Sequence, residues 1–160
     1  EGPVYLRLHR PSKPMEPNEP FLPLEIGKGQ LLIEGTDAII FAMGHMVDVS
    51  LDAAKTLLKN GIKVAVGNIH SLKPLDTDFI LENSKLASVV VTAENHSIIG
   101  GLGSAVAETL LEGGVSRKFK RIGIEDTFAE GGSTQFLFDK YGLNSSHIQN
   151  TIKRLLANDR

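Results

Sequence analysis

Residues 88–111 read SVVVTAENHSIIGGLGSAVAETLL, a stretch that joins a strand to a helix through a glycine-rich turn. The run from Ser88 to Thr92 has three consecutive valines and predicts a strand that is buried on both faces. Leu102 to Leu111 then carries apolar residues at helical spacing and ends before Gly113-Gly114. A buried strand followed at once by a helix is typical of a mostly parallel sheet with helices on both faces.

The same alternation of strand and helix continues on both sides of this stretch. Further strands are predicted at Gln30–Glu34, Ala38–Met43, Ile62–Val66 and Phe119–Ile124. Further helices are predicted from Val47 to a stop at Asn60-Gly61, from Pro74 and Asp76 onward, and as two short helices at the end, the last opening near Ser146 with Gln149 as a capping box. Because ligands of such sheets bind outside the carboxyl ends of the strands, the loops of interest are Gly44-His45, Asn68–Lys73, Glu94–Gly103 and Asp126–Gly132.

The first 29 residues have a different character. Val4 to Leu8 is strand-like, and a strand needs partner strands. We interpret residues 1–10 as the last strand of a preceding domain, with a frayed terminus as the alternative. Prolines then fall at every third position from Pro11 to Pro23, which excludes helix and central strand. Residues 11–29 are therefore expected to be a stiff, extended linker, with a proline-rich recognition motif as the alternative.

Composition limits the classes of function. The chain has 160 residues, 41% of them hydrophobic, which suits one domain with a sizeable core, residues 30–160. A net charge of -2 gives no sign of a nucleic-acid or membrane partner. We see neither a transmembrane run nor a signal peptide. The absence of cysteine excludes disulfides and thiolate sites and agrees with the cytoplasmic location that we expect.

The glycine-rich loop holds the first candidate site residues. Gly100, Gly101 and Gly103 permit a tight turn and expose N–H groups at a helix start, which suits an anion. The Gly-Gly-x-Gly spacing is not the dinucleotide fingerprint, however, so a purely structural turn is the alternative. Glu94 in the same loop could hydrogen-bond the free N–H groups. His96 is either a catalyst or an ordinary satisfied polar residue.

Other site chemistries lack a signature. The remaining histidines are His9, His45, His70 and His147, and no pair of them has metal-ligand spacing on a helix. No Gly-x-Ser-x-Gly motif is present. We therefore expect neither a metal site nor a serine nucleophile, and we assign no catalytic residue to this chain.

Four segments resemble the carboxy-terminal third of transketolases, in one order and spacing over essentially the whole chain. They are Val4-Tyr5-Leu6-Arg7-Leu8-His9-Arg10-Pro11, His70-Ser71-Leu72-Lys73-Pro74-Leu75-Asp76, Glu94-Asn95-His96-Ser97 leading into Gly100-Gly101-Leu102-Gly103, and Asp126-Thr127-Phe128 leading into Gly131-Gly132-Ser133. The Lys-Pro-Leu-Asp and Gly-Gly-x-Gly pieces are shared with deoxyxylulose-phosphate synthase and the β subunits of 2-oxo-acid dehydrogenases. Arg-Leu-His-Arg-Pro is more similar to transketolase, because the synthase usually reads Arg-Tyr-Pro-Arg-Gly there.

The resemblance implies a fold and an activity. The family domain is a three-layer α/β/α sandwich whose five-stranded sheet is mostly parallel with one antiparallel strand, here Gln30–Glu34. Transketolases are dimeric transferases that use thiamine diphosphate and Mg²⁺ to move a two-carbon ketol unit between sugar phosphates of the pentose phosphate pathway. Both cofactors are held by the two preceding domains, so this chain alone is expected to bind neither and to be inactive. The expected partners are those upstream domains or a separate subunit, a second copy, and the sugar phosphate.

One family residue carries over by position. In transketolases the second arginine of the first segment binds the substrate phosphate, and Arg10 matches it. A guanidinium offers paired donors and a permanent charge, which suits a phosphate; the alternative is a solvated arginine beside the linker. Two other interpretations of the whole chain remain: the carboxy-terminal part of deoxyxylulose-phosphate synthase, and a non-catalytic regulatory or interaction module.

Overall fold

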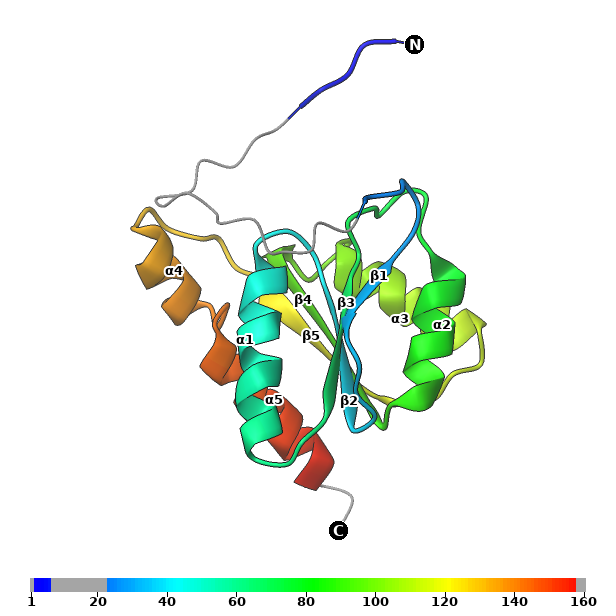
Figure 1. Cartoon of the computed structure of the whole chain (residues 1–160). Coiled ribbons are helices and arrows are strands. Elements are labelled where there is room, and N and C mark those ends of the chain that lie inside the picture. The colour runs from blue at the N-terminus through cyan, green and yellow to red at the C-terminus, as the bar shows by residue number, and fades with distance from the viewer. Residues whose placement is uncertain (1, 7–22, 158–160) are drawn as a thin grey trace.

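The computed structural model describes residues 2–6 and 23–157. Five strands form one sheet in the order β1-β3-β2-β4-β5, in which β1 is antiparallel to β3 and the other neighbours are parallel. Figure 1 shows α1 and α5 on one face of this sheet and α2 and α3 on the other. In chain order the elements are β1 (Gln30–Ile33), β2 (Ala38–Ala42), α1 (Met46–Lys59), β3 (Val64–Asn68), α2 (Thr77–Leu86), β4 (Val89–Ser97), α3 (Leu102–Glu112), β5 (Lys118–Ile124), α4 (Thr134–Lys140) and α5 (Ser145–Ala157).

The central strand β2 shows how the sequence builds the three layers. All five of its residues are buried, and successive side chains of a strand point to opposite faces. Ala38, Ile40 and Ala42 join the core beneath α1 and α5. Ile39 and Phe41 join the second core beneath α2 and α3. A strand buried on both faces must be apolar throughout, which is why the sequence there lacks the alternation of a half-exposed strand.

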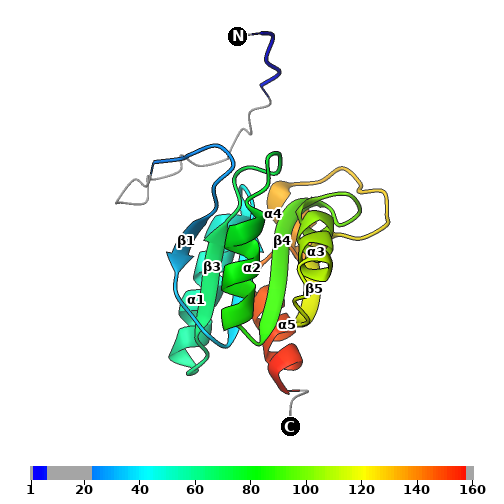
Figure 2. The same ribbon diagram turned by 90° about the vertical axis from the view of Figure 1, so that its right-hand side faces the viewer.

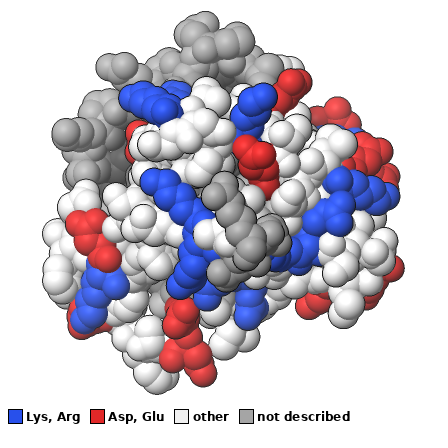
Figure 3. Space-filling model, turned by 90° about the horizontal axis from the view of Figure 1, so that it is seen from below, with Lys and Arg blue, Asp and Glu red and all other residues white. Residues whose placement is uncertain are grey.

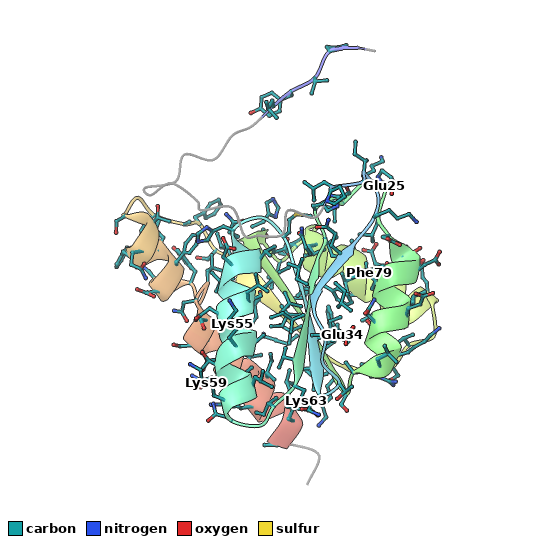
Figure 4. The ribbon with its side chains drawn as sticks, in the orientation of Figure 1. Glu25, Glu34, Lys55, Lys59, Lys63 and Phe79 are labelled. Atoms are coloured by element: carbon teal, nitrogen blue, oxygen red, sulfur yellow. The ribbon has the colours of Figure 1, made fainter. Side chains whose placement is uncertain are left out.

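An aromatic residue fixes where the chain enters the domain. Phe79 of α2 points toward β1 and β3 (Figure 4) and meets Phe41 edge-on, with ring centroids 6.1 Å apart. A Cβ on Gly29 would lie 2.3 Å from this ring, so only glycine fits there. The Gly29 N–H also donates to Asp76, whose carboxylate caps α2 by accepting from the Phe79 N–H. Residues 23–29 are thereby tied to the start of α2.

The expected fold class is confirmed, with corrections to three elements. β4 does not end at Thr92 but runs to Ser97, so Glu94 and His96 lie on a strand rather than in a loop. The last helix begins at Ser145, and the side chain of the preceding Asn144 accepts from the His147 N–H at 2.9 Å. The predicted Ser146–Gln149 capping box is therefore wrong. β3 begins at Val64, two residues later than expected, because the Ile62 N–H still donates to the Leu57 carbonyl at the end of α1.

The predictions for the first segment remain open. Residues 2–6 form neither helix nor strand and are exposed. The strand expected at 1–10 would pair with another domain, so it stays a prediction. Arg10 and the prolines from Pro11 to Pro20 lie outside the described residues. Within the described ranges, no helix is long and apolar enough to cross a membrane.

Candidate functional site

The loops that follow β2, β4 and β5 meet at the carboxyl edge of the sheet, the upper end in Figures 1 and 2. Two backbone hydrogen bonds join them there: the Met43 N–H donates to the Ala93 carbonyl, and the Ile98 N–H donates to the Ile124 carbonyl. The chain also enters the domain at this edge, because Gln30 at the start of β1 pairs with Asn68 at the end of β3. The edge that sequence analysis selected is therefore the one where four loops converge.

Glu94 is the centre of the glycine-rich segment. Its side chain is almost completely buried, and its two carboxylate oxygens accept hydrogen bonds of 2.8 Å from the Leu102 and Gly103 N–H groups. These are two of the donors that the first turn of α3 leaves without an intrahelical partner. A carboxylate is also favoured there by the positive end of the helix dipole. The buried Glu94 carboxylate thus caps the amino terminus of α3.

The close packing around the Glu94 carboxylate explains why glycine occupies several positions of this segment. A Cβ on Gly101 would lie 2.0 Å from a Glu94 carboxylate oxygen, and one on Gly103 would lie 2.8 Å from the Thr92 hydroxyl. Gly100 has a φ of 73°, a left-handed conformation that favours glycine. Gly123 on β5 faces the same place, since its Cβ would lie 2.8 Å from the His96 carbonyl oxygen. The glycines therefore let the backbone close around the carboxylate.

Further side chains hold the loop between β4 and α3 in place. The Arg121 guanidinium donates to the Ile98 carbonyl at 2.8 Å. The Ser104 hydroxyl donates to the same carbonyl at 3.1 Å and accepts from the Gly100 N–H at 3.0 Å. The Ser97 hydroxyl accepts from the Ile99 N–H at 3.1 Å. With these contacts and the Glu94 cap, the loop has a network of hydrogen bonds while the Ile99 side chain stays 59% exposed.

This geometry bears on the candidate anion site at Glu94, His96, Gly100, Gly101 and Gly103. Two N–H groups that could cradle an anion already donate to Glu94, which favours the structural alternative. An external anion would have to displace the buried Glu94 carboxylate to reach these N–H groups. Anion binding at this site stays a prediction. His96 is 67% exposed in its side chain; its Nδ1 lies 2.9 Å from the Ser97 carbonyl oxygen and 4.0 Å from Glu94 Oε2.

A cleft beside β5 was not predicted from the sequence. It has a volume of about 450 Å³ and lies between β5, the segment after it, and the junction of α4 and α5. Its charged lining residues have both signs: Lys120, Arg121, Glu125, Asp126, Asp139 and Lys140. The hydrogen bond from the Lys140 ammonium to the Glu130 carboxylate raises the pKa of Lys140 above its usual 10.5. Because these residues come from separate elements, no local sequence pattern reveals the cleft.

In the described ranges, 2–6 and 23–157, the histidines and acidic residues do not assemble into a metal site. Among the described residues, no group of three or more His, Cys, Asp or Glu is placed to hold an ion. His45 immediately precedes α1, and its ring meets Phe138 at a centroid distance of 5.0 Å. His70 Nδ1 lies 3.1 Å from the Ser71 hydroxyl. These two histidines therefore have local contacts within the fold.

Comparison with known proteins identifies the domain. The profile of the transketolase C-terminal domain matches residues 27–148. The chain is 43% identical over 158 residues to an uncharacterized transketolase family protein of Sinorhizobium fredii, covering 98% of this chain and 46% of the relative. It is 40% identical over 153 residues to a transketolase C-terminal section of Methanocaldococcus jannaschii, covering 95% and 48%. It is also 46% identical over 134 residues to 1-deoxy-D-xylulose-5-phosphate synthase of Caldanaerobacter subterraneus, covering 84% and 21%.

Solved structures agree with the fold. A split-gene transketolase, described as an inactive β4 tetramer, superposes with a TM-score of 0.79 at 42% identity over 87% of this chain and 45% of that one. A transketolase of Pichia stipitis superposes with a TM-score of 0.64 at 19% identity, over 82% of this chain and 18% of that one, and shows the fold alone. The chain spans about half the length, or less, of the relatives that it matches. By profile, sequence and fold, it belongs to the transketolase C-terminal domain family.

Proposed function

We propose that this chain is the carboxy-terminal part of a thiamine-diphosphate-dependent transketolase, which transfers a two-carbon ketol unit between sugar phosphates. The observation that carries the proposal is the match to transketolase relatives that are themselves about twice its length, over 95–98% of this chain. One further relative is a 6-deoxy-6-sulfo-D-fructose transketolase subunit of a Clostridium species, 43% identical over 92% of this chain and 45% of that subunit. The protein would work as the second half of a divided enzyme or as the end of a longer chain.

Two features of the described residues support placing the cofactor in the preceding part of the enzyme. The glycine-rich turn is the one loop in which sequence analysis found a candidate anion cradle, and Glu94 accepts from the Leu102 and Gly103 N–H groups at the start of α3. The same described part of the chain has no cluster of acidic or histidine ligands for Mg²⁺. When bound elsewhere, thiamine diphosphate supplies the carbanion chemistry. In this proposal the domain described here has a structural role in the assembled enzyme.

Arg10 is our proposal for the one residue of this chain that touches substrate. It stands in Arg7-Leu8-His9-Arg10-Pro11, the segment that resembles transketolase at the position that binds the substrate phosphate. A guanidinium would bind that phosphate through charge-assisted hydrogen bonds and thereby orient the sugar. Arg10 precedes the domain, so it would belong to the active site of the preceding domain.

The runner-up is deoxyxylulose-phosphate synthase. Several synthases match this chain at 37–46% identity, as closely as the transketolase relatives do. This chain covers only 21–25% of the length of these synthases. The Arg-Leu-His-Arg-Pro segment favours transketolase. We therefore keep ketol transfer between sugars as the main proposal.

Assays of the complete protein, assembled with its thiamine-binding part, would decide between these activities. We expect transfer from xylulose 5-phosphate to ribose 5-phosphate that requires thiamine diphosphate and Mg²⁺. Condensation of pyruvate with glyceraldehyde 3-phosphate would instead establish the synthase. Failure of both reactions with a cofactor-loaded assembly would favour a non-catalytic module. In parallel, calorimetry on the 160-residue chain should detect no binding of thiamine diphosphate with Mg²⁺, and micromolar affinity would contradict the proposal.

A further inference from the structure

We propose that the outer edge of β5 binds an extended acidic segment of another polypeptide, which adds to the sheet as a further strand. The inference concerns binding alone and does not depend on the proposed ketol transfer. β5 is the last strand in the order β1-β3-β2-β4-β5, and Figure 2 shows it beside α3 and α5. Its sequence, Lys-Phe-Lys-Arg-Ile-Gly-Ile, has three cations and no acidic residue.

The backbone of β5 has hydrogen-bonding groups on its outer side. The Ile124 carbonyl accepts from the Ile98 N–H, so the backbone groups of Ile124 point toward β4. Because these groups alternate in direction along a strand, those of Phe119, Arg121 and Gly123 point away from β4. Within residues 2–6 and 23–157, no backbone hydrogen bond from another element reaches these three residues. Such an edge is the template to which an extended peptide adds.

Three side chains at this edge lie on the face that α2 and α3 cover. Phe119 packs against the core beneath these helices. The Arg121 side chain runs past the start of α3, where its Cγ would lie 2.7 Å from a Cβ on Gly103. Arg117, the residue before β5, donates to backbone carbonyls at the end of α2. Arg117, Phe119 and Arg121 are alternate residues and therefore form a cation–aromatic–cation row along the edge.

The positive charges of this row are not cancelled within the described part of the chain. The Arg117 guanidinium donates to three backbone carbonyls. The Arg121 guanidinium donates to the Ile98 carbonyl and the Ser104 hydroxyl. These neutral acceptors fix the positions of both guanidinium groups and leave their charge in place. Figure 3 shows that lysine and arginine side chains run across the middle of the end of the molecule at which β5 begins.

An apolar hollow lies beside the aromatic residue of the row. It has a volume of about 350 Å³, and its lining includes Ala107, Leu110, Leu111, Val115, Arg117 and Phe119. Leu111 is 83% exposed, so the hollow is open to a partner. In an antiparallel strand, the residues opposite the row would share its face. The segment that fits has an apolar residue opposite Phe119 and an acidic residue opposite each arginine, in the pattern acidic-x-apolar-x-acidic.

Charge favours an acidic segment over a second copy of β5. Two antiparallel β5 strands would place cations against cations, and like charges directly opposite are destabilising. Lysine on an edge strand is a common means of preventing such pairing. An acidic strand avoids this repulsion and complements both arginines. Its intervening side chains would face the cleft of mixed charge on the other side of β5, where Lys120 already lies 3.8 Å from Glu125.

Fluorescence anisotropy with the 160-residue chain tests the inference. The probe is a labelled peptide, Thr-Glu-Thr-Leu-Thr-Glu-Thr, which we expect to bind with micromolar affinity that weakens as salt is added. The same peptide with lysine in place of both glutamates should not bind. N-methylation of its leucine removes a backbone donor and should weaken binding about 10-fold or more.

A matched pair of variants locates the site on the chain. Leu111→Ser should weaken binding of the acidic peptide about 3- to 10-fold, because it removes an apolar wall of the hollow. The control is Leu58→Ser, which changes a 59% exposed leucine of α1 on the other face of the sheet. It should leave binding unchanged, and both variants should keep the unfolding midpoint of the wild-type chain.

Three results would overturn the inference. The first is no binding of the acidic peptide at about 1 mM chain, or equal binding of the acidic and basic peptides. The second is binding that neither N-methylation nor Leu111→Ser weakens. The third is self-association of the chain that Leu111→Ser abolishes and the acidic peptide does not affect, which would show that a second copy occupies the edge. None of these results bears on ketol transfer, which the assays of the complete enzyme test separately.

Discussion

Replacing Glu94 with alanine should be one of the most damaging single changes in this domain. The side chain is 3% exposed and accepts two hydrogen bonds of 2.8 Å from the first turn of α3. Alanine would leave the Leu102 and Gly103 N–H groups buried without an acceptor. A hydrogen bond to a charged group contributes about 1.5–3 kcal/mol, so the two together give a loss of about 3–6 kcal/mol. That is a large part of the stability of an ordinary domain.

Chemical denaturation of the free chain would measure this loss, with the slope checked for two-state behaviour. At about 2–4 °C per kcal/mol for a domain of this size, Tm should fall by roughly 6–24 °C. Glu94→Gln keeps one acceptor oxygen and should lose about half as much. Glu108→Gln is the control, because Glu108 is an exposed residue of the same helix and surface changes usually stay within about 0.5 kcal/mol.

Two results would refute this reasoning. A loss below about 1 kcal/mol for Glu94→Ala would mean that water or a rearranged loop satisfies the N–H groups as well as the carboxylate does. Stabilisation of the wild-type chain by added phosphate, with stronger stabilisation of Glu94→Ala, would instead indicate that the glycine-rich loop binds an external anion. That second result would support the open prediction for His96, Gly100, Gly101 and Gly103.

Four further predictions can be checked separately. Arg10→Ala in the complete enzyme should lower kcat/KM about 10- to 100-fold for phosphorylated sugars and should spare hydroxypyruvate; an equal loss with both would contradict a phosphate contact. Gly123→Ala should destabilise the free chain by about 1–3 kcal/mol in the denaturation assay, because the added Cβ would lie 2.8 Å from the His96 carbonyl oxygen. Gly131→Ala is the control and should be neutral, because a Cβ there would meet nothing within 4 Å. The pKa of Lys140, measured by NMR, should lie above 10.5 and should return toward that value in Glu130→Gln. Because the pKa of Lys140 is raised in the folded chain, the Lys140–Glu130 pair contributes to stability below pH 10.5. This contribution is lost as the pH rises through the folded pKa. The free chain should self-associate at high concentration through apolar surface that its missing neighbours would cover, and strictly monomeric sedimentation would count against this.

The central elements could be predicted because single physical causes dominate them. Ala38–Ala42 and Val89–Val91 are apolar on both faces, and only a sheet covered by two helix layers buries such runs. The Asn60-Gly61 and Gly113-Gly114 pairs stop α1 and α3 close to the places expected. The antiparallel placement of β1 could not be derived from its four residues; it came from the family resemblance.

The errors arose where tertiary contacts decide the local structure. Glu94, Asn95 and His96 look like loop residues, yet β4 continues through them, because Ser97 pairs with Ile124 of β5. The cap of the last helix moved from Ser146 to Asn144, because several residues around that helix start are capable of capping and the sequence alone does not rank them. The cleft beside β5 depends on residues from three elements, which periodicity cannot bring together.

The glycine-rich segment shows how one motif can serve two opposite purposes. Three glycines before a helix expose N–H groups, and in many proteins a phosphate uses them. Here a glutamate six residues before the first of these glycines lies on the preceding strand, and its carboxylate fills that position. The distinction therefore depends on whether an acidic side chain from the same chain can reach the helix start. When it can, the motif stabilises the fold and shapes the loop surface.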